Sequence, residues 1–306
     1  MKRYYKSANS ILNIRLLLLF VFLITAYIAE AQKYDKLKAL TGSSILTYYS
    51  DDAGDRAEMI SNRCNSVMNY YSKVLGFAPK VTLLVLNPED WPQYTNFPVY
   101  GMPHYTDDQT LIVASEDNDF WRSFIPPLDG LPEVLEGQIR QTYTDEKGVV
   151  TMRDFFDLLA IHELGHAFHF QGGLTMHRKW LQELFANIFL HTYIAENEPR
   201  YLPALTVFPQ MVIAGGKEGL KYTSLADLES RYDEIGMQYP KNYGWYQCRW
   251  HAGAKDIYDQ GGIAVMKNLW TSLKARNTEI PEQELASFLN SNVHASVAEM
   301  LTEWDK

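Results

Sequence analysis

His162, Glu163 and His166 combine two imidazoles and a carboxylate at a spacing that suits metal chemistry. Residues four apart share one face of a helix, so the two histidines can supply two corners of a tetrahedral metal site. Glu163 lies about 100° further round the helix, beside the metal position rather than on it. A general base for a zinc-activated water should lie there. The alternative is a chance match, with the histidines facing core and solvent and Glu163 a surface charge.

The segment that carries this motif predicts a buried helix. Residues 155–168 are apolar almost all round the helix, as a helix inside a core should be. Thr151 or Asp154 can cap its start, and the glycine pair 172–173 can end it. Gly165 costs about 1 kcal/mol relative to alanine in mid-helix, so we expect a neighbouring element to approach closely at that residue.

The chain before the motif predicts strands and one long helix. β-Branched and apolar runs indicate the strands, and apolar residues at helical spacing indicate the helix, which Gly76 ends. The predicted strands span 45–49, 80–86 and 109–115, the helix spans 52–75, an irregular loop covers 88–108, and one short helix falls within 116–150.

The chain after the motif predicts helices alone. They span 177–196, 224–231, 243–258, 263–274, 282–289 and 296–304, with prolines 199, 203 and 209 breaking the segment after the first. We therefore expect an α+β protein. Residues 32–173 form a small mixed β-sheet with the motif helix, residues 174–306 form an all-helical C-terminal subdomain, and the motif helix lies at the seam.

The N-terminus predicts export. Residues 1–31 contain four basic residues, an apolar run at 16–29 and a small-x-small cleavage site at 29–31, as in a secretory signal peptide. Cleavage near Ala31 would leave a periplasmic or extracellular protein without stable membrane insertion. The alternative is an uncleaved anchor, for which the apolar run is short. Cleavage would move the formal charge from -9 to -12, which makes a nucleic-acid partner a poor fit.

Two cysteines, Cys64 and Cys248, limit the thiol chemistry of the chain. Two thiols are too few for a cysteine-based zinc site. In an oxidising compartment the two could pair, and two free buried thiols are the equal alternative.

A catalytic zinc needs three protein ligands and an open position. The continuation of the motif to a third histidine fails, because Gly172 stands where that histidine would be. The next glutamate is Glu183, in Trp180-Leu-Gln-Glu-Leu-Phe-Ala186. This run resembles the second helix of gluzincin metallopeptidases, the thermolysin-like and aminopeptidase-like group. The resemblance implies Zn²⁺ as cofactor, Glu183 as its third ligand and a zincin-like fold.

The resemblance also implies further roles. Asn187 stands where many family members carry an acidic residue that orients a ligand histidine, and an amide polarises the ring less. An edge strand near 101–115 would pair with an extended substrate. A downstream tyrosine or histidine would donate to the oxyanion, with Tyr246 favoured, then Tyr243, then His251. The remaining histidines of the two helices, His169, His177 and His191, are expected to be packed, rim or surface residues.

These features together predict an exported zinc-dependent metallopeptidase acting on a peptide or protein substrate. Glu163 would be the general base, and Tyr246 would stabilise the oxyanion. An endopeptidase is favoured over an aminopeptidase, because no acidic motif for a free amine is evident. The alternatives are a catalytically inactive zincin-like module that binds zinc or peptide, and a structural protein without metal. The sequence leaves the substrate and the oligomeric state open.

Overall fold

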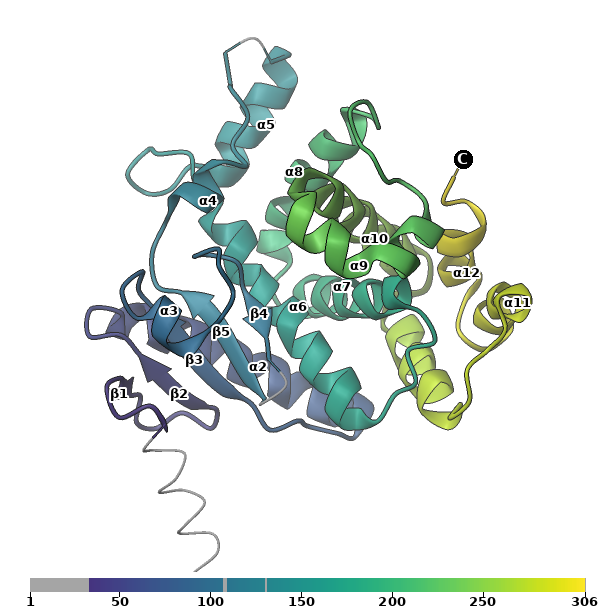
Figure 1. Cartoon of the computed structure of the whole chain (residues 1–306), viewed down its shortest axis with the longest axis horizontal. Coiled ribbons are helices and arrows are strands. Elements are labelled where there is room, and N and C mark those ends of the chain that lie inside the picture. Colours follow the sequence, from purple (N-terminus) through teal and green to yellow (C-terminus); the bar gives the residue numbers. More distant parts are fainter. Residues whose placement is uncertain (1–32, 107–108, 130, 306) are drawn as a thin grey trace, which may run out of the picture.

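The computed structural model describes residues 33–106, 109–129 and 131–305 as a mixed α/β structure, mainly helical with one small sheet (Figure 1). The predicted signal peptide lies outside these residues. Within them, no helix is long and apolar enough to cross a membrane. Cys64 and Cys248 are both buried and both free, so the second of the two expectations for the thiols is confirmed.

The sheet has five strands in the order β1-β2-β3-β5-β4. The three central strands are parallel, and a short antiparallel strand pairs with each edge. Every residue of β3 and β5 is buried, as expected for parallel strands covered on both faces. The strands are β1 (Lys38–Ala39), β2 (Leu46–Tyr49), β3 (Thr82–Leu86), β4 (His104–Tyr105) and β5 (Thr110–Ala114).

Two helices connect the sheet to the rest of the molecule. Helix α2 (Gly54–Leu75) packs on β2, β3 and α6 (Arg153–Gly172), and α6 also contacts β4 and β5. A buried ion pair between Arg56 of α2 and Asp157 of α6 fixes the two helices to each other. Because both partners are largely removed from water, loss of either would leave an uncompensated charge inside the protein.

The chain from α7 (Lys179–Asn197) to α12 (Ala295–Thr302) contains only helices within the described residues, and we call it the helical half. It is built around α7, which lies between α6 and α10 (Pro240–Ala275). Fourteen of its nineteen residues are buried, so α7 is a core helix on all sides. Figure 1 shows α6 and α7 at the junction between the sheet and the helical half. The other helices are α3 (Trp91–Tyr94), α4 (Asp119–Arg122), α5 (Glu133–Tyr143), the 3₁₀ helix η1 (Pro199–Tyr201), α8 (Leu202–Ala214), α9 (Leu225–Gln238), α11 (Glu282–Asn292) and α12 (Ala295–Thr302).

Several predicted elements differ from those in the structure. The expected loop over 88–108 contains α3 and the edge strand β4, and the segment 116–150 contains two helices rather than one. The two helices predicted at 243–258 and 263–274 form one helix, α10, which kinks at Gly262 with φ 57°. The helix therefore continues through a bend at Gly262, because glycine tolerates that positive φ.

The prolines after α7 mark helix starts more often than breaks. Pro199 opens η1 and Pro203 lies in the first turn of α8, where a missing backbone N–H leaves no bond unmade. Pro209 lies inside α8 without ending it. The expected broken segment is therefore mostly helical.

The start of the motif helix also differs from the prediction. Its N-cap is Met152, without a side-chain cap, and Asp154 lies within the first turn. The Thr151 hydroxyl accepts a hydrogen bond from the amide of Arg153. The predicted end is confirmed, because Gly173 caps α6 in the left-handed conformation with φ 70°.

Candidate metal centre

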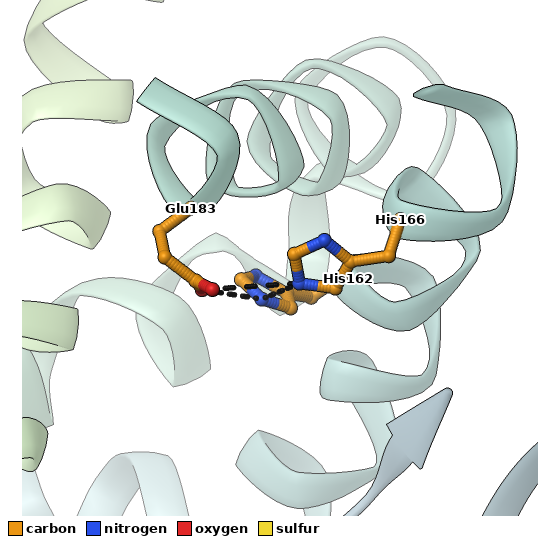
Figure 2. A group of neighbouring side chains, drawn as sticks. All are labelled: His162, His166 and Glu183. Atoms are coloured by element: carbon orange, nitrogen blue, oxygen red, sulfur yellow. Dashed lines mark hydrogen bonds and ion pairs between the residues drawn. The ribbon is translucent and has the colours of Figure 1, made fainter. Parts of the chain in front are cut away.

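Three buried side chains from two helices converge on one point (Figure 2). His162 and His166 of α6 present their Nε2 atoms 3.1 Å apart. The Oε2 atom of Glu183, from α7, lies 3.3 Å from Nε2 of His162 and 3.8 Å from Nε2 of His166. The structure thus brings together the three residues that the sequence analysis assigned as metal ligands.

The close packing of α6 and α7 places these side chains. A Cβ built on Gly165 would lie 3.0 Å from the Cα of Ala186, so only glycine lets α7 come this near. Gly165 lies one residue before His166, and Ala186 lies three after Glu183. The close approach expected at Gly165 is therefore confirmed, and the neighbouring element is the helix that carries the third residue of the group.

The geometry of the triad fits a metal ion. Ligand bonds of about 2.0–2.1 Å at tetrahedral angles give distances of about 3.3 Å between ligand atoms. The three observed distances lie close to this value. Two imidazole nitrogens and one carboxylate oxygen, all buried, can therefore hold a metal ion.

The protonation of Glu183 and His166 also suits ligation. Burial alone would raise the pKa of Glu183, but the two imidazoles and Tyr232 hold it well below its usual range, so the side chain is a carboxylate. Burial lowers the pKa of His166 to about 4, which keeps that ring neutral at physiological pH. Burial also acts to lower the pKa of His162, but the hydrogen bond and charge of Glu183 raise it overall.

Glu163 lies beside the triad and reaches toward the edge of the sheet. The amide of Tyr105 in β4 donates a hydrogen bond to its carboxylate. Burial raises the pKa of Glu163 to about 8, and the negative charge of Glu183 adds to the shift against the opposing effects of His162 and Tyr105. A carboxyl group with such a pKa can take up and release a proton near neutral pH.

The strand β4 presents backbone groups toward the site. The amide of Thr106 bonds to the carbonyl of Thr110 in β5, so the amide and carbonyl of the preceding residue, Tyr105, face away from the sheet. The edge strand expected near 101–115 is thus β4, whereas β5 lies inside the sheet.

Two further side chains hold Glu183, and the sequence analysis found neither. The hydroxyl of Tyr232 in α9 donates to Oε1, and the amide of Gln247 in α10 donates to Oε2 at 2.8 Å. Gln247 is four residues after Tyr243, and its amide also donates to the Tyr243 hydroxyl at 3.0 Å. The position of an amide one turn from a candidate tyrosine in an aromatic-rich helix was a signal for Gln247. Tyr232 carried no comparable signal.

The downstream aromatic candidates lie in different environments. The Tyr246 hydroxyl donates to the carbonyl of Ser224 at 2.6 Å, and its ring is fully buried in a stack with two tryptophans, Trp250 and Trp304. His251 is buried against Phe155.

Tyr243 is the candidate that lies within the metal centre. It is only partly buried, and its hydroxyl lies 3.4 Å from that of Tyr232. Burial and the charge of Glu183 raise its pKa, so Tyr243 stays protonated and can donate a hydrogen bond. Tyr243, the second choice of the sequence analysis, therefore lies beside the triad. The favoured Tyr246 instead bonds to the Ser224 carbonyl.

Each ligand histidine has a polar neighbour behind it. Nδ1 of His162 and Oδ1 of Asn187 are both buried without a hydrogen-bond partner in the described part of the chain, and the Asn187 side chain contributes to raising the pKa of His162. Nδ1 of His166 lies 2.9 Å from Nε2 of His169, which is also buried. His169 is thus a packed residue, as expected, but one in contact with a ligand. His177 and His191 are buried as well, rather than on the helix surface.

An aromatic rim continues the ligand face of α6. Phe170 lies one turn beyond His166 and is 57% exposed. Its ring stacks on that of Tyr105, 6.5 Å away, and lies 6.3 Å from that of His166. Two aromatic rings, those of Phe170 and Tyr105, therefore lie next to His166 at this end of the triad.

Comparisons of this chain with protein-family models, curated proteins and solved structures find no match. The interpretation of the centre therefore rests on its own residues and geometry.

Proposed function

We propose that this protein is an exported zinc-dependent metallopeptidase of the gluzincin type, with a zincin-like fold. The observation that carries the proposal is the convergence of His162, His166 and Glu183 beside a carboxyl group, Glu163, that does not belong to the ligand set. Three protein ligands of this kind with a separate base are the composition of a hydrolytic zinc site.

The donor set favours zinc over other common ions. Two imidazoles and one carboxylate are a typical catalytic zinc set, whereas magnesium and calcium prefer oxygen ligands alone. His162 and His166 would bind through Nε2 and Glu183 through Oε2. Bound zinc would act as a Lewis acid on the scissile carbonyl and lower the pKa of water.

Glu163 would act as the general base and then as the general acid of the reaction. Its carboxylate would accept a proton from the attacking water and later deliver it to the leaving amine, so that the amine departs neutral. The hydrogen bond from the Tyr105 amide orients the carboxylate beside the triad.

Tyr243 would stabilise the negative charge that develops on the carbonyl oxygen. It is the only one of the three downstream candidates in hydrogen-bond contact with the residues that hold Glu183. Because its hydroxyl stays protonated, it can donate to an oxyanion. This role replaces the one expected for Tyr246.

The edge strand β4 supports an extended peptide as substrate. The outward-facing backbone of this edge lies beside Glu163, whose carboxylate already accepts the Tyr105 amide, so a peptide extended along this edge would pass the triad. The exposed ring of Phe170 offers an apolar contact for a substrate side chain. An endopeptidase remains favoured, and export follows from the predicted signal peptide.

The test is a cleavage profile. Mature protein, loaded with one equivalent of zinc, is incubated with a proteome-derived peptide mixture, and mass spectrometry identifies new termini. The proposal expects internal cleavage that chelation abolishes and zinc restores. Zinc binding with peptide capture but without new termini would favour the inactive binding module, and absence of zinc binding would reject the proposal.

A further inference from the structure

His169 lies one turn after His166 on α6 and contacts it directly. Nδ1 of His166 and Nε2 of His169 are 2.9 Å apart, and the two ring planes are close to perpendicular at 81°. His169 is only 1% exposed. This buried polar contact lies on the side of His166 that faces away from Glu183 and His162.

The proton on His166 determines what this contact means. A neutral imidazole carries one proton, on either Nδ1 or Nε2. The Nε2 atom of His166 faces the other two ligand atoms, so ligation through it requires the proton on Nδ1. That proton then points at Nε2 of His169, which must accept it and carry its own proton on Nδ1.

The opposite direction of the same hydrogen bond would exclude ligation. If Nε2 of His169 donated to Nδ1 of His166, the proton of His166 would lie on its own Nε2, in the metal position. The direction of this hydrogen bond therefore distinguishes the tautomer of His166 that can bind a metal from the tautomer that cannot. A metal ion binds only the former, so it selects the tautomer in which His169 accepts.

Packing holds the His169 ring in place. The ring lies edge-on to Phe185 of α7, with centroids 5.8 Å apart, and 4.1 Å from Phe170. Phe185 lies two residues after Glu183. The helix that carries Glu183 therefore also holds His169, the hydrogen-bond partner of His166. The acceptor is a neutral imidazole where metal sites commonly use a carboxylate or a backbone carbonyl.

We propose that His169 is a positioning residue for the metal centre: it accepts the Nδ1 proton of His166 and thereby orients Nε2 of His166 toward the metal. The inference rests on the metal-binding part of the proposed function and is independent of peptide cleavage. The contact between His169 and His166 would therefore affect the metal affinity of the chain.

The test compares two substitutions of His169. His169→Phe keeps a flat ring but removes the acceptor, whereas His169→Gln places an amide oxygen near the position of Nε2. His191→Phe is the matched control, because His191 is also a buried histidine, 4% exposed, in the neighbouring helix. Zinc dissociation constants are measured by competition with a chromophoric chelator, and the visible spectrum of the Co²⁺-loaded protein reports ligand geometry.

We expect His169→Phe to weaken zinc binding by about 10- to 100-fold, the usual effect of losing the partner of a ligand histidine. His169→Gln should bind within a few-fold of wild type, and His191→Phe should bind as wild type does. Equal affinity in His169→Phe and wild type, or equal weakening in His169→Gln and His169→Phe, would overturn the inference while zinc binding itself stands. A wild-type chain that binds no zinc would overturn both the inference and the proposed function.

A second measurement uses the wild-type protein and so does not depend on the folding of a variant. Long-range ¹H–¹⁵N spectra of the zinc-loaded chain identify the protonated nitrogen of each histidine. The expected result is a proton on Nδ1 of His166 and on Nδ1 of His169. A proton on Nε2 of His169 would contradict the proposed acceptor.

Discussion

At the scale of single residues, each ligand of the candidate metal centre is held by a further side chain. His166 contacts His169, Glu183 accepts from Tyr232 and Gln247, and His162 faces Asn187. Such partners fix ring orientation and carboxylate geometry before a metal arrives. A ligand set held in this way loses little conformational freedom on binding, which favours affinity.

Substitutions of Tyr243 and Tyr246 in α10 should have opposite effects. Tyr243→Phe removes a hydroxyl that lies in the metal centre, so kcat should fall by about 10²-fold, the usual effect of losing one oxyanion donor, with zinc content unchanged. Tyr246→Phe removes a hydroxyl that bonds to the Ser224 carbonyl, so kcat should hold while the free energy of unfolding falls by about 1 kcal/mol.

Steady-state kinetics and urea unfolding of the two variants measure these effects. A large loss of kcat in Tyr246→Phe, with Tyr243→Phe unaffected, would return the oxyanion role to Tyr246.

The residues on one helix could be predicted from spacing, and those that depend on tertiary contacts could not. His162 and His166 follow from the period of the helix alone. Tyr243 and Tyr246 are three residues apart in one aromatic run, and which of them reaches the triad depends on the rotation of α10 against α7. Tyr232 is on a third helix, whose position relative to Glu183 no local pattern reports.

At the scale of elements, the centre depends on the spacing of α6 and α7. Helix α6 carries His162, His166 and Glu163, and α7 carries Glu183. Gly165 sets how closely they pack, with the Cα of Ala186 3.0 Å from the place of a Cβ. Since backbone atoms cannot move aside as a flexible side chain can, a larger residue at 165 must separate the helices.

Gly165→Ala should therefore weaken zinc binding by at least tenfold, because it moves Glu183 away from the histidines. It should also lower the free energy of unfolding by about 1–3 kcal/mol through overpacking. Gly137→Ala is the matched control: Gly137 is an exposed residue of α5, no atom of the described residues lies within 4 Å of a built Cβ, and alanine should stabilise that helix slightly.

Zinc affinity and urea unfolding of both variants measure the effect. If Gly165→Ala bound zinc like wild type, the spacing of α6 and α7 would not control the centre.

The elements with strong local signals were predictable, and the short ones were not. Continuous apolar runs identified β3 and β5, and the long periodic segments identified α2, α6 and α7. The two-residue strand β4 has no period of its own and exists because β5 offers it an edge. Two separate helices were expected at 243–258 and 263–274, but buried residues on both sides of Gly262 carry α10 through the kink.

At the scale of the whole molecule, the core of the helical half encloses histidines whose pKa values are lowered mainly by burial. Burial lowers the pKa of His191 to about 4 and that of His251 to about 3. The unfolded chain protonates these rings near pH 6.5. Between the two values the unfolded state binds more protons, so the free energy of unfolding falls as the pH falls.

For His191 alone this effect is about 2 to 3 kcal/mol between pH 7 and pH 4.5, because each pKa unit corresponds to about 1.4 kcal/mol. We expect metal-free wild type to lose stability over this range, and His191→Phe to lose less by about that amount. Urea unfolding at the two pH values measures the difference. An identical pH dependence in variant and wild type would contradict the lowered pKa of His191.

The central claim is that Glu163 acts as the base of a zinc-dependent hydrolase built on His162, His166 and Glu183. The most direct measurement is the rate at which Glu163→Gln and wild type, brought to the same zinc content, cleave the same peptide. Glutamine keeps the shape of the side chain but has no carboxylate to accept a proton. We predict a loss of at least 10²-fold in kcat with zinc affinity retained, and equal rates for the two proteins would contradict the account.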